Sequence, residues 1–257
     1  MESTCRLLID PPGEGPWNMA VDEVLLESAA ENGLATLRFY RWKVPTLSLG
    51  YFQSSADRTQ HAPSLKCSLV RRSTGGGAIL HDRELTYSVA LPAHHPLATD
   101  ADRLYCAVHS ALLGVLNERL EAASELKAQR CVFPEVPPVK PFLCFHRRAS
   151  GDLLLTRDPE SRTAQKVAGS AQRRRRGAVL QHGSLLLAAS PFAPELPGIV
   201  ELTGVRFDLG RLISDWAREL QSVLPWGVEQ PLSDEEAALA SKLETERFAS
   251  SAWTNRR

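Results

Sequence analysis

Three consecutive glycines, Gly75 to Gly77, stand between two stretches of sequence that are typical of β-strands. A glycine triplet lets the backbone adopt a positive φ and approach another group closely, where any side chain would clash. Taken alone, such a triplet is more typical of a tight turn than of a binding loop. The residues on either side of the triplet are therefore needed to distinguish a tight turn from a binding loop.

Alternating hydrophobicity predicts strands on both sides of this triplet. From residue 85 to residue 91, apolar residues alternate with polar ones, which is the pattern of a half-buried strand. Runs of apolar and β-branched residues predict further strands. These lie at residues 37–40, 46–50, 67–72, 151–155, 167–169 and 178–187.

Helical periodicity appears at both ends of the chain and in its middle. The predicted helices occupy residues 19–31, 100–122, 209–224 and 233–248. We expect Asn18 to cap the first helix and Gly33 to follow its end, while Ser233 and Glu236 form a capping box on the last. Because strands and helices mix without a regular β-α-β alternation, the sequence predicts an α+β fold with a helical C-terminal section.

We expect a single domain over residues 1–257, with a core at about 15–190 and a helical section at about 205–250. A chain of this length buries a substantial core as one unit. Four prolines interrupt residues 130–141, where we predict an ordered connection rather than a boundary between domains.

Composition excludes several classes of protein. Thirty basic residues balance thirty acidic ones, so the charge excess of a general nucleic-acid binder is absent. No run of about eighteen apolar residues could span a membrane, and no targeting segment is apparent, so we predict a soluble cytoplasmic protein. The five cysteines are scattered without a C-x-x-C pair, and the histidines lack metal-ligand spacing. We therefore predict neither disulfides nor a metal site.

The flanks of the glycine triplet favour a binding loop. Arg72 enters the loop and could pair with a carboxylate or a phosphate. His81 leaves it and could donate or accept a hydrogen bond at the same ligand. The alternative is that both side chains simply occupy solvated strand ends.

Residues 71–82, RRSTGGGAILHD, resemble the R-R-x-T-G-G-G-x-x-x-H-D signature of the family that contains lipoate-protein ligases and lipoyl-assembly octanoyltransferases. Further matches follow the family order: NMAVD at 18–22, PTLSLG at 45–50, KVAGSAQ at 166–172 and QHGS at 181–184. The resemblance implies a biotin/lipoate protein ligase-like catalytic domain, with a mixed β-sheet flanked by helices. Biotin ligases carry an arginine-rich glycine loop, so biotin is the weaker substrate expectation.

The same resemblance implies two walls of a tunnel for the acyl group and the arm of its carrier. One wall would comprise Arg72, Thr74, Gly75, Gly76, Gly77 and His81. The opposite wall would comprise Gly169, Ser170, Ala171, Gln172 and His182.

Cys144, followed by Phe145, resembles the nucleophile of the cysteine-dependent octanoyltransferases in this family. A thiolate can accept an acyl group from a thioester, and aminolysis of the acyl-enzyme is downhill, so ATP is unnecessary. Lys166 resembles the family lysine and is expected to favour the thiolate, because a nearby ammonium lowers the pKa of a thiol. An arbitrary cysteine is usually an inert buried thiol.

The resemblance implies an octanoyltransferase that uses acyl carrier protein as donor and a lipoyl domain, such as glycine cleavage H protein, as acceptor. Three alternatives remain open. They are an ATP-dependent lipoate ligase, which alone would require ATP and magnesium, an amidotransferase acting between carrier domains, and a carrier-binding protein without turnover. Arg173 to Arg176 predict a basic loop beside the site, suited to docking of acidic carriers.

Overall fold

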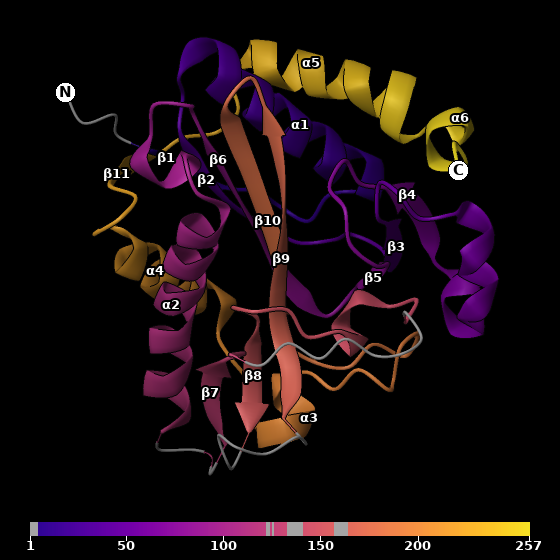
Figure 1. The fold of residues 1–257 in the computed structure, drawn as a ribbon, viewed down its shortest axis with the longest axis vertical. Helices are drawn as coiled ribbons and strands as arrows, with labels where there is room; N and C mark the ends of the chain where they lie inside the picture. The colour runs from indigo at the N-terminus through magenta and orange to yellow at the C-terminus, as the bar shows by residue number, and fades with distance from the viewer. Residues whose placement is uncertain (1–4, 122–123, 125, 133–140, 157–163) are drawn as a thin grey trace.

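The computed structural model describes residues 5–257 except 122–123, 125, 133–140 and 157–163. Its described part is built around a mixed eight-stranded sheet in the order β11-β1-β2-β6-β10-β9-β8-β7 (Figure 1). In chain order these strands are β1 (Cys5–Ile9), β2 (Thr36–Tyr40), β6 (Glu84–Leu91), β7 (Lys127–Arg130), β8 (Leu153–Thr156), β9 (Gln165–Arg175), β10 (Ala178–Leu186) and β11 (Trp226–Glu229). A second sheet, in the order β4-β3-β5, comprises β3 (Thr46–Leu49), β4 (Ser68–Arg71) and β5 (Ile79–His81).

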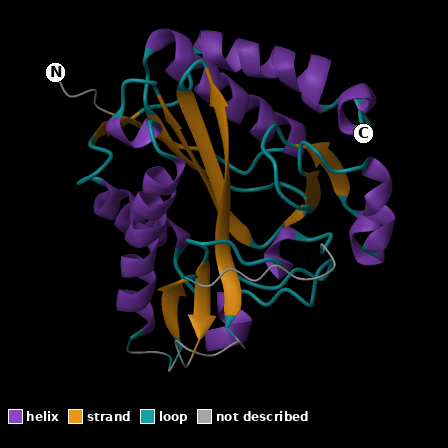
Figure 2. Cartoon of the chain, in the orientation of Figure 1, coloured by secondary structure: helices purple, strands orange, loops and turns teal. Residues whose placement is uncertain are grey.

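Helices cover both faces of the large sheet, as Figure 2 shows. On one face α1 packs against β6 and β10, and α5 lies against α1. On the other face α2 packs with α4. The helices are α1 (Gly15–Asn32), α2 (Ala101–Leu120), α3 (Ile199–Thr203), α4 (Leu209–Leu220), α5 (Asp234–Leu243) and α6 (Ser251–Thr254), and a π-helical turn (Glu244–Phe248) continues α5. The predicted α+β class and the helical C-terminal section are therefore confirmed.

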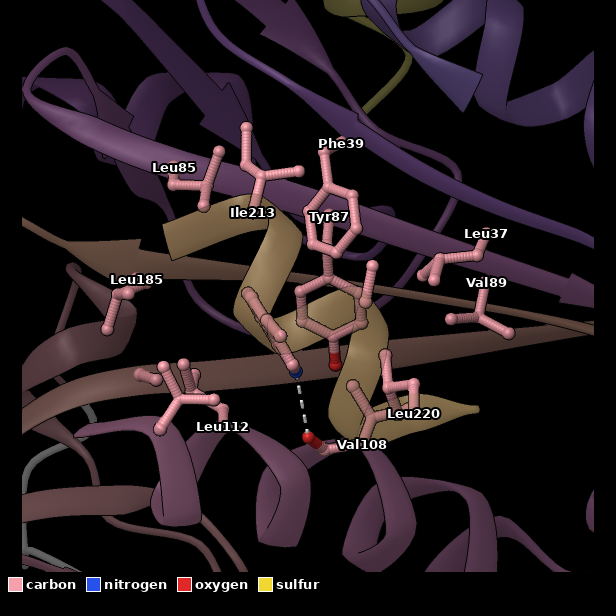
Figure 3. Packing of buried hydrophobic residues seen from close by; sticks show 14 of the residues in the cluster. Leu37, Phe39, Leu85, Tyr87, Val89, Val108, Leu112, Leu185, Ile213 and Leu220 are labelled. Carbon is pink, nitrogen blue, oxygen red and sulfur yellow. Dashed lines mark hydrogen bonds between the residues drawn. The ribbon is translucent and has the colours of Figure 1, made fainter. Parts of the chain in front are cut away.

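The larger core lies between the sheet and the pair α2 and α4 (Figure 3). Its centre is Trp216 of α4, which is fully buried and packs on Phe39 and Tyr87 at ring-centroid distances of 5.3 and 5.0 Å. The indole Nε1 donates a hydrogen bond to the carbonyl oxygen of Val108 in α2. One side chain thereby joins both helices to the sheet.

The strand predicted at residues 85–91 exists, but the expectation that it is half-buried is wrong. All residues of β6 are buried, because α1 covers one face of the sheet and α2 with α4 covers the other. Its polar side chains are satisfied inside the protein; Ser88, for example, donates a hydrogen bond to Asp22 of α1. Alternation in this strand separates two buried environments rather than core from solvent.

The helix ends match the capping signals in two cases and differ in one. Gly33, in the left-handed region with φ of 70°, follows the end of α1 as predicted, and Ser233 forms the predicted capping box at α5. Asn18 was expected to cap the first helix, but α1 begins at Gly15. The amide of Asn18 lies buried within the helix and donates to two loop carbonyls. Asn18 therefore connects the helix to the neighbouring loops instead of capping its N-terminus.

The run of four arginines does not form the expected basic loop. Strand β9 continues to Arg175, and only Arg176, with φ of 48°, lies in the turn to β10. Arg175 and Arg176 form ion pairs with glutamates of α1, and Arg174 donates to the carbonyl of Ala98. These arginines stabilise the contact between the hairpin and the helices because the hairpin extends across α1.

The C-terminal residues are tied to the strand that leads into the glycine triplet. Arg71, fully buried in β4, donates from Nε and Nη2 to the carbonyl oxygen of Thr254, at 2.9 and 2.7 Å. In return Trp253 Nε1 donates to the carbonyl of Arg71. Most of the proline-rich connection predicted at residues 130–141 lies outside the described residues. None of the described helices has the length and apolarity needed to cross a membrane.

Replacing Trp216 with alanine should lower the free energy of unfolding by about 3–5 kcal/mol, since the cavity would open between three elements that cannot all collapse into it. Equilibrium denaturation in urea measures this change. Val228→Ala, at a position 73% exposed, is the control and should change stability by less than about 0.5 kcal/mol. A loss below about 1 kcal/mol for Trp216→Ala would contradict its assignment as the centre of the core.

Candidate functional site

The glycine triplet and the predicted nucleophile are held together by backbone hydrogen bonds. The N–H of Ala78 donates to the carbonyl of Phe142 at 2.9 Å, and the N–H of Cys144 donates to the carbonyl of Ala78 at 2.7 Å. Cys144 begins a short 3₁₀ turn (Cys144–His146) directly after this pairing. These two hydrogen bonds pair segments that lie 66 positions apart in the sequence, and this pairing fixes the position of the Cys144 thiol.

Arg72 determines the shape of the loop. Its Nη2 donates to the carbonyl oxygens of Gly75 and Gly77, both at 2.7 Å. Nη1 donates to the backbone and side-chain oxygens of Ser48, and Nε donates to the hydroxyl of Thr74 at 3.1 Å. The guanidinium therefore lies inside the loop and orients its peptide groups, instead of occupying a solvated strand end.

Gly76 has to be glycine for two reasons. Its φ is +96°, a conformation that other residues adopt only with strain. A Cβ at this position would fall 2.9 Å from Nη2 of Arg72 and 3.9 Å from Sγ of Cys144. The absent side chain therefore leaves the guanidinium and the thiol facing one small volume.

A buried hydrogen-bonded chain links α1 to the loop. Asp22 accepts from Arg38, Tyr40 and Nδ1 of His182, at 2.8, 3.0 and 2.9 Å. Burial alone would raise the pKa of Asp22, but the His182 hydrogen bond and the Arg38 charge outweigh it and hold the pKa below its usual value. With Nδ1 donating, Nε2 of His182 accepts from the hydroxyl of Thr74 at 2.6 Å. Since the Thr74 hydroxyl also accepts from Nε of Arg72, Thr74 connects His182 to Arg72 by hydrogen bonds.

His81 occupies a second buried network. Burial lowers its pKa, which favours the neutral imidazole. Nδ1 donates to the carboxylate of Glu84 at 2.7 Å, so Nε2 accepts from the hydroxyl of Ser48 at 2.8 Å. Trp42 stacks on the imidazole with a centroid distance of 3.8 Å. The imidazole of His81 is therefore fixed by two hydrogen bonds and by stacking on Trp42.

Lys166 is paired with Asp152, an acidic residue that was not predicted for the site. Its Nζ lies 2.8 Å from Oδ2 of Asp152, and the other carboxylate oxygen accepts from the hydroxyl of Tyr105 at 2.6 Å. The ammonium also lies 5.2 Å from the ring centroid of Phe145, the residue after Cys144. Both members of the ion pair are more than nine-tenths buried, so their charges neutralise each other inside the protein.

Helix α2 contributes a further buried network, which is bonded to Ser170 of β9, the strand that carries Lys166. Burial lowers the pKa of His109 to about 4, so the ring is neutral near pH 7. Its Nδ1 donates to the carbonyl of Gly151, and Nε2 then accepts from the hydroxyl of Ser170 at 2.7 Å. Ser170 in turn accepts from the hydroxyl of Tyr87, which accepts from the amide of Gln181. Every polar group in this series has one compatible direction of donation.

These networks surround one cavity between the two sheets. Residues that were predicted for the site and line it are Arg72, Gly75, Gly76, His81, Cys144, Lys166, Gly169, Ser170, Ala171 and His182. Residues that line it but were not predicted for the site are Met19, Tyr40, Trp42, Ile79, Thr86, Phe145, Gly183 and Ser184. The NMAVD match contains Met19, whereas neither Tyr40 nor Trp42 belongs to a recognisable motif.

Three predicted residues stand behind the lining. Thr74 forms a hydrogen bond with His182, and the carbonyl of Gly77 accepts from Arg72. The amide of Gln172 donates to Gln181 and to the carbonyl of Ala101 at the start of α2, so it braces the hairpin. Within the described ranges, no cluster of His, Cys, Asp and Glu side chains is arranged to bind a metal ion.

The fold matches that of solved lipoate ligases. A chain from the structure of a bi-partite lipoate protein ligase from Thermoplasma acidophilum superposes with a TM-score of 0.74 at 21% identity, over 99% of this chain and 97% of that one. A lipoate-protein ligase A structure bound with ATP superposes with a TM-score of 0.74 at 22% identity, over 98% of each chain. The fold is therefore that of the lipoate protein ligases.

Sequence similarity establishes the family. Residues 14–195 match the model of the lipoyl protein ligase A/B catalytic domain. The octanoyltransferase LipM of Brevibacillus brevis is 32% identical over 98% of this chain and 99% of its own, and that of Bacillus anthracis is 30% identical over 92% of both. The chain belongs to the lipoyl protein ligase A/B catalytic domain family, and with these relatives it is an acyltransferase.

Gly169→Ala should displace the ammonium of Lys166, because a Cβ there would lie 2.5 Å from Cε of Lys166 and 2.9 Å from Oδ1 of Asp152. We expect a loss of about 1–3 kcal/mol in the free energy of unfolding, measured by chemical denaturation. Gly114→Ala, on the exposed face of α2 with no atom within 4 Å of the new Cβ, should instead stabilise by about 0.5–1 kcal/mol. Equal effects of the two substitutions would contradict the close packing at Gly169.

Proposed function

We propose that the protein moves an octanoyl group from acyl carrier protein to a lysine of a lipoyl domain, such as glycine cleavage H protein, through a thioester on Cys144. The observation that carries this proposal is the meeting of Cys144 and Lys166 at one cavity beside the glycine loop. The octanoyltransferase names of its full-length relatives support the same reaction.

The proposed chemistry has two acyl transfers and needs no nucleotide. In the first, the thiolate of Cys144 attacks the donor thioester, the bond to the donor sulfur breaks, and the donor thiol takes up a proton. In the second, the neutral amine of the acceptor lysine attacks the acyl-enzyme, an amide forms, and the thiolate returns while the amine releases its proton. Lys166, fixed by Asp152, would donate a hydrogen bond to the acyl oxygen in both steps.

The cavity wall suits a medium-length alkyl chain. Met19 of α1, Tyr40 of β2, Ile79 of β5 and Trp42, which follows β2, present apolar surface to the cavity. Burying each methylene of a fatty chain against such a wall contributes about 0.8 kcal/mol. Orientation of the reactive carbonyl would then come from the polar groups at the opposite end, near Cys144.

Incubation with octanoyl-acyl carrier protein, without nucleotide and without acceptor, should add one octanoyl mass to the enzyme. The adduct should be removed by hydroxylamine and map to the peptide containing Cys144, and Cys144→Ala should abolish both adduct and transfer. Intact-protein mass spectrometry makes the measurement, with Cys106→Ala as the control that keeps both.

Two other results would replace this proposal. If Cys144→Ala still modified the acceptor when supplied with octanoate or lipoate, ATP and magnesium, the protein would be a ligase. If the adduct formed only from an acylated lipoyl domain and not from acyl carrier protein, it would be an amidotransferase.

Carrier docking, which the sequence analysis placed on Arg173 to Arg176, is better supported at the C-terminal residues. Arg256 stacks over Tyr51 at 4.3 Å, and Arg257 lies over Phe52, which is 69% exposed, at 5.3 Å. Phe52 in turn borders Gly75 of the loop. Neither of these two exposed arginines pairs with a described carboxylate, so an acidic protein surface complements this edge of the site.

Replacing Arg256 and Arg257 with serine should lower kcat/KM for an acidic carrier about tenfold at low ionic strength, while kcat is retained. Steady-state kinetics across a salt series measure this effect, which should vanish as salt screens the charges. The matched control is Arg175→Ser with Arg176→Ser, which removes two arginines already paired with α1. An equal loss in the control would show that overall charge, rather than this edge, guides docking.

A further inference from the structure

Arg72 is a buried cation with exclusively neutral partners. Its side chain is 1% exposed, and all of its hydrogen bonds go to carbonyl or hydroxyl oxygens of Ser48, Thr74, Gly75 and Gly77. Within the described part of the chain no carboxylate forms an ion pair with it. Burying a charge without an opposite charge is unfavourable, so such a group favours an anion placed beside it.

Other buried arginines provide the comparison. Arg38 is fully buried and forms ion pairs with Asp22 and Asp10, at 2.8 and 2.7 Å. Arg71, the neighbour of Arg72, is equally buried and also bonds carbonyl oxygens, but it faces the C-terminal residues and does not line the cavity. Arg72 is thus distinguished by facing the cavity without a carboxylate partner.

The reactive thiol lies on the same side of the loop. Arg72 and Cys144 both line the cavity, and both face the space left by the missing side chain of Gly76. Nη2 and Sγ are respectively 2.9 and 3.9 Å from the position that a Cβ of Gly76 would take. Nothing bulkier than a hydrogen atom of Gly76 occupies that point.

The other cations near Cys144 are either paired with a carboxylate or partly exposed to solvent. Lys166 of β9 is paired with Asp152, so the pair carries no net charge. Arg147, just after the nucleophile's own turn, also donates to a carbonyl, that of Pro141, but it is partly exposed to solvent and does not line this cavity.

The remaining titratable groups at the cavity come from β2, β5 and β10. His81 is kept neutral by burial. His182 and the hydroxyl of Tyr40 both donate to the same carboxylate, that of Asp22. None of these three supplies an uncompensated positive charge to the thiol.

We propose that Arg72, rather than Lys166, is the counter-cation that stabilises the thiolate of Cys144, leaving Lys166 to hold the acyl oxygen. Arg72 acts through the nucleophile and is therefore a positioning residue. Burial lowers the pKa of Arg72 to about 10, and a charged Cys144 shifts this pKa upward, as mutual stabilisation requires. The inference rests on the proposed function only in taking Cys144 as the nucleophile.

Alkylation by iodoacetamide tests this inference without any acyl transfer, so its failure is separable from failure of the proposed reaction. The rate is followed on the Cys144 peptide by mass spectrometry from pH 5 to pH 10, because Cys106 is also partly exposed. Arg72→Gln should move the midpoint of the rate profile upward by about one pH unit or more. Arg72→Lys should recover most of that shift, and Lys166→Ala should leave the midpoint nearer to that of the parent.

Arg71→Gln is the matched control, since it removes an equally buried guanidinium that does not reach the cavity. An unshifted midpoint in folded Arg72→Gln would overturn the inference. So would an equal shift in Arg71→Gln, or a larger shift in Arg147→Gln or Lys166→Ala than in Arg72→Gln.

A second measurement leaves Arg72 in place, in case its replacement prevents folding. Cys144→Asp puts a carboxylate where the thiolate would be, and Cys144→Asn is its neutral counterpart of nearly equal size. At pH 7 the Cys144→Asp variant should unfold at a higher temperature than Cys144→Asn, because it supplies the missing negative charge. A lower unfolding temperature for Cys144→Asp would contradict the inference.

Discussion

The site depends on one buried guanidinium that holds a glycine loop from the inside. Arg72 bonds the carbonyls of Gly75 and Gly77, and the backbone that follows the loop pairs with the segment that presents Cys144. Such a loop forms only if its peptide groups find partners, because unpaired backbone groups are costly to bury. The hydrogen bonds from Asp22 through His182 to Thr74 extend this constraint into α1, so the helix, the loop and the segment that presents Cys144 form one connected unit.

Much of the fold follows from local sequence signals. The glycine triplet, the alternation in β6 and the capping box at Ser233 each predict structure from neighbouring residues, and each was found where the sequence placed it. The signals gave less about burial, because alternation does not reveal that helices cover both faces of the sheet. Strands β1 and β11 were not predicted, since their short apolar runs acquire a strand conformation only by pairing with each other and with β2.

The cavity itself could be predicted only as far as motifs extend. Family resemblance identified Cys144 and Lys166, and the structure brings them to one cavity. It gave no sign of Asp152 or Tyr105, because ion pairs and hydrogen bonds between distant segments leave no local pattern. The run Arg173 to Arg176 was misread for a related reason: a charged sequence is typical of a loop, whereas here glutamates of α1 allow the strand to continue to Arg175. The contacts of the site that involve residues outside the motifs can therefore be seen only in the folded structure.

In the proposed reaction, the octanoyl group rests on Cys144 between its donor and its acceptor. The most direct test of this reaction is a chase of the isolated acyl-enzyme: protein acylated with octanoyl is separated from its donor, mixed rapidly with the lipoyl domain, and quenched over time. If the thioester lies on the reaction path, the octanoyl mass should leave the enzyme and appear on the acceptor lysine at a rate no slower than steady-state turnover. Transfer slower than turnover, or release as free octanoate, would contradict the proposed reaction, because the thioester would then lie off the reaction path.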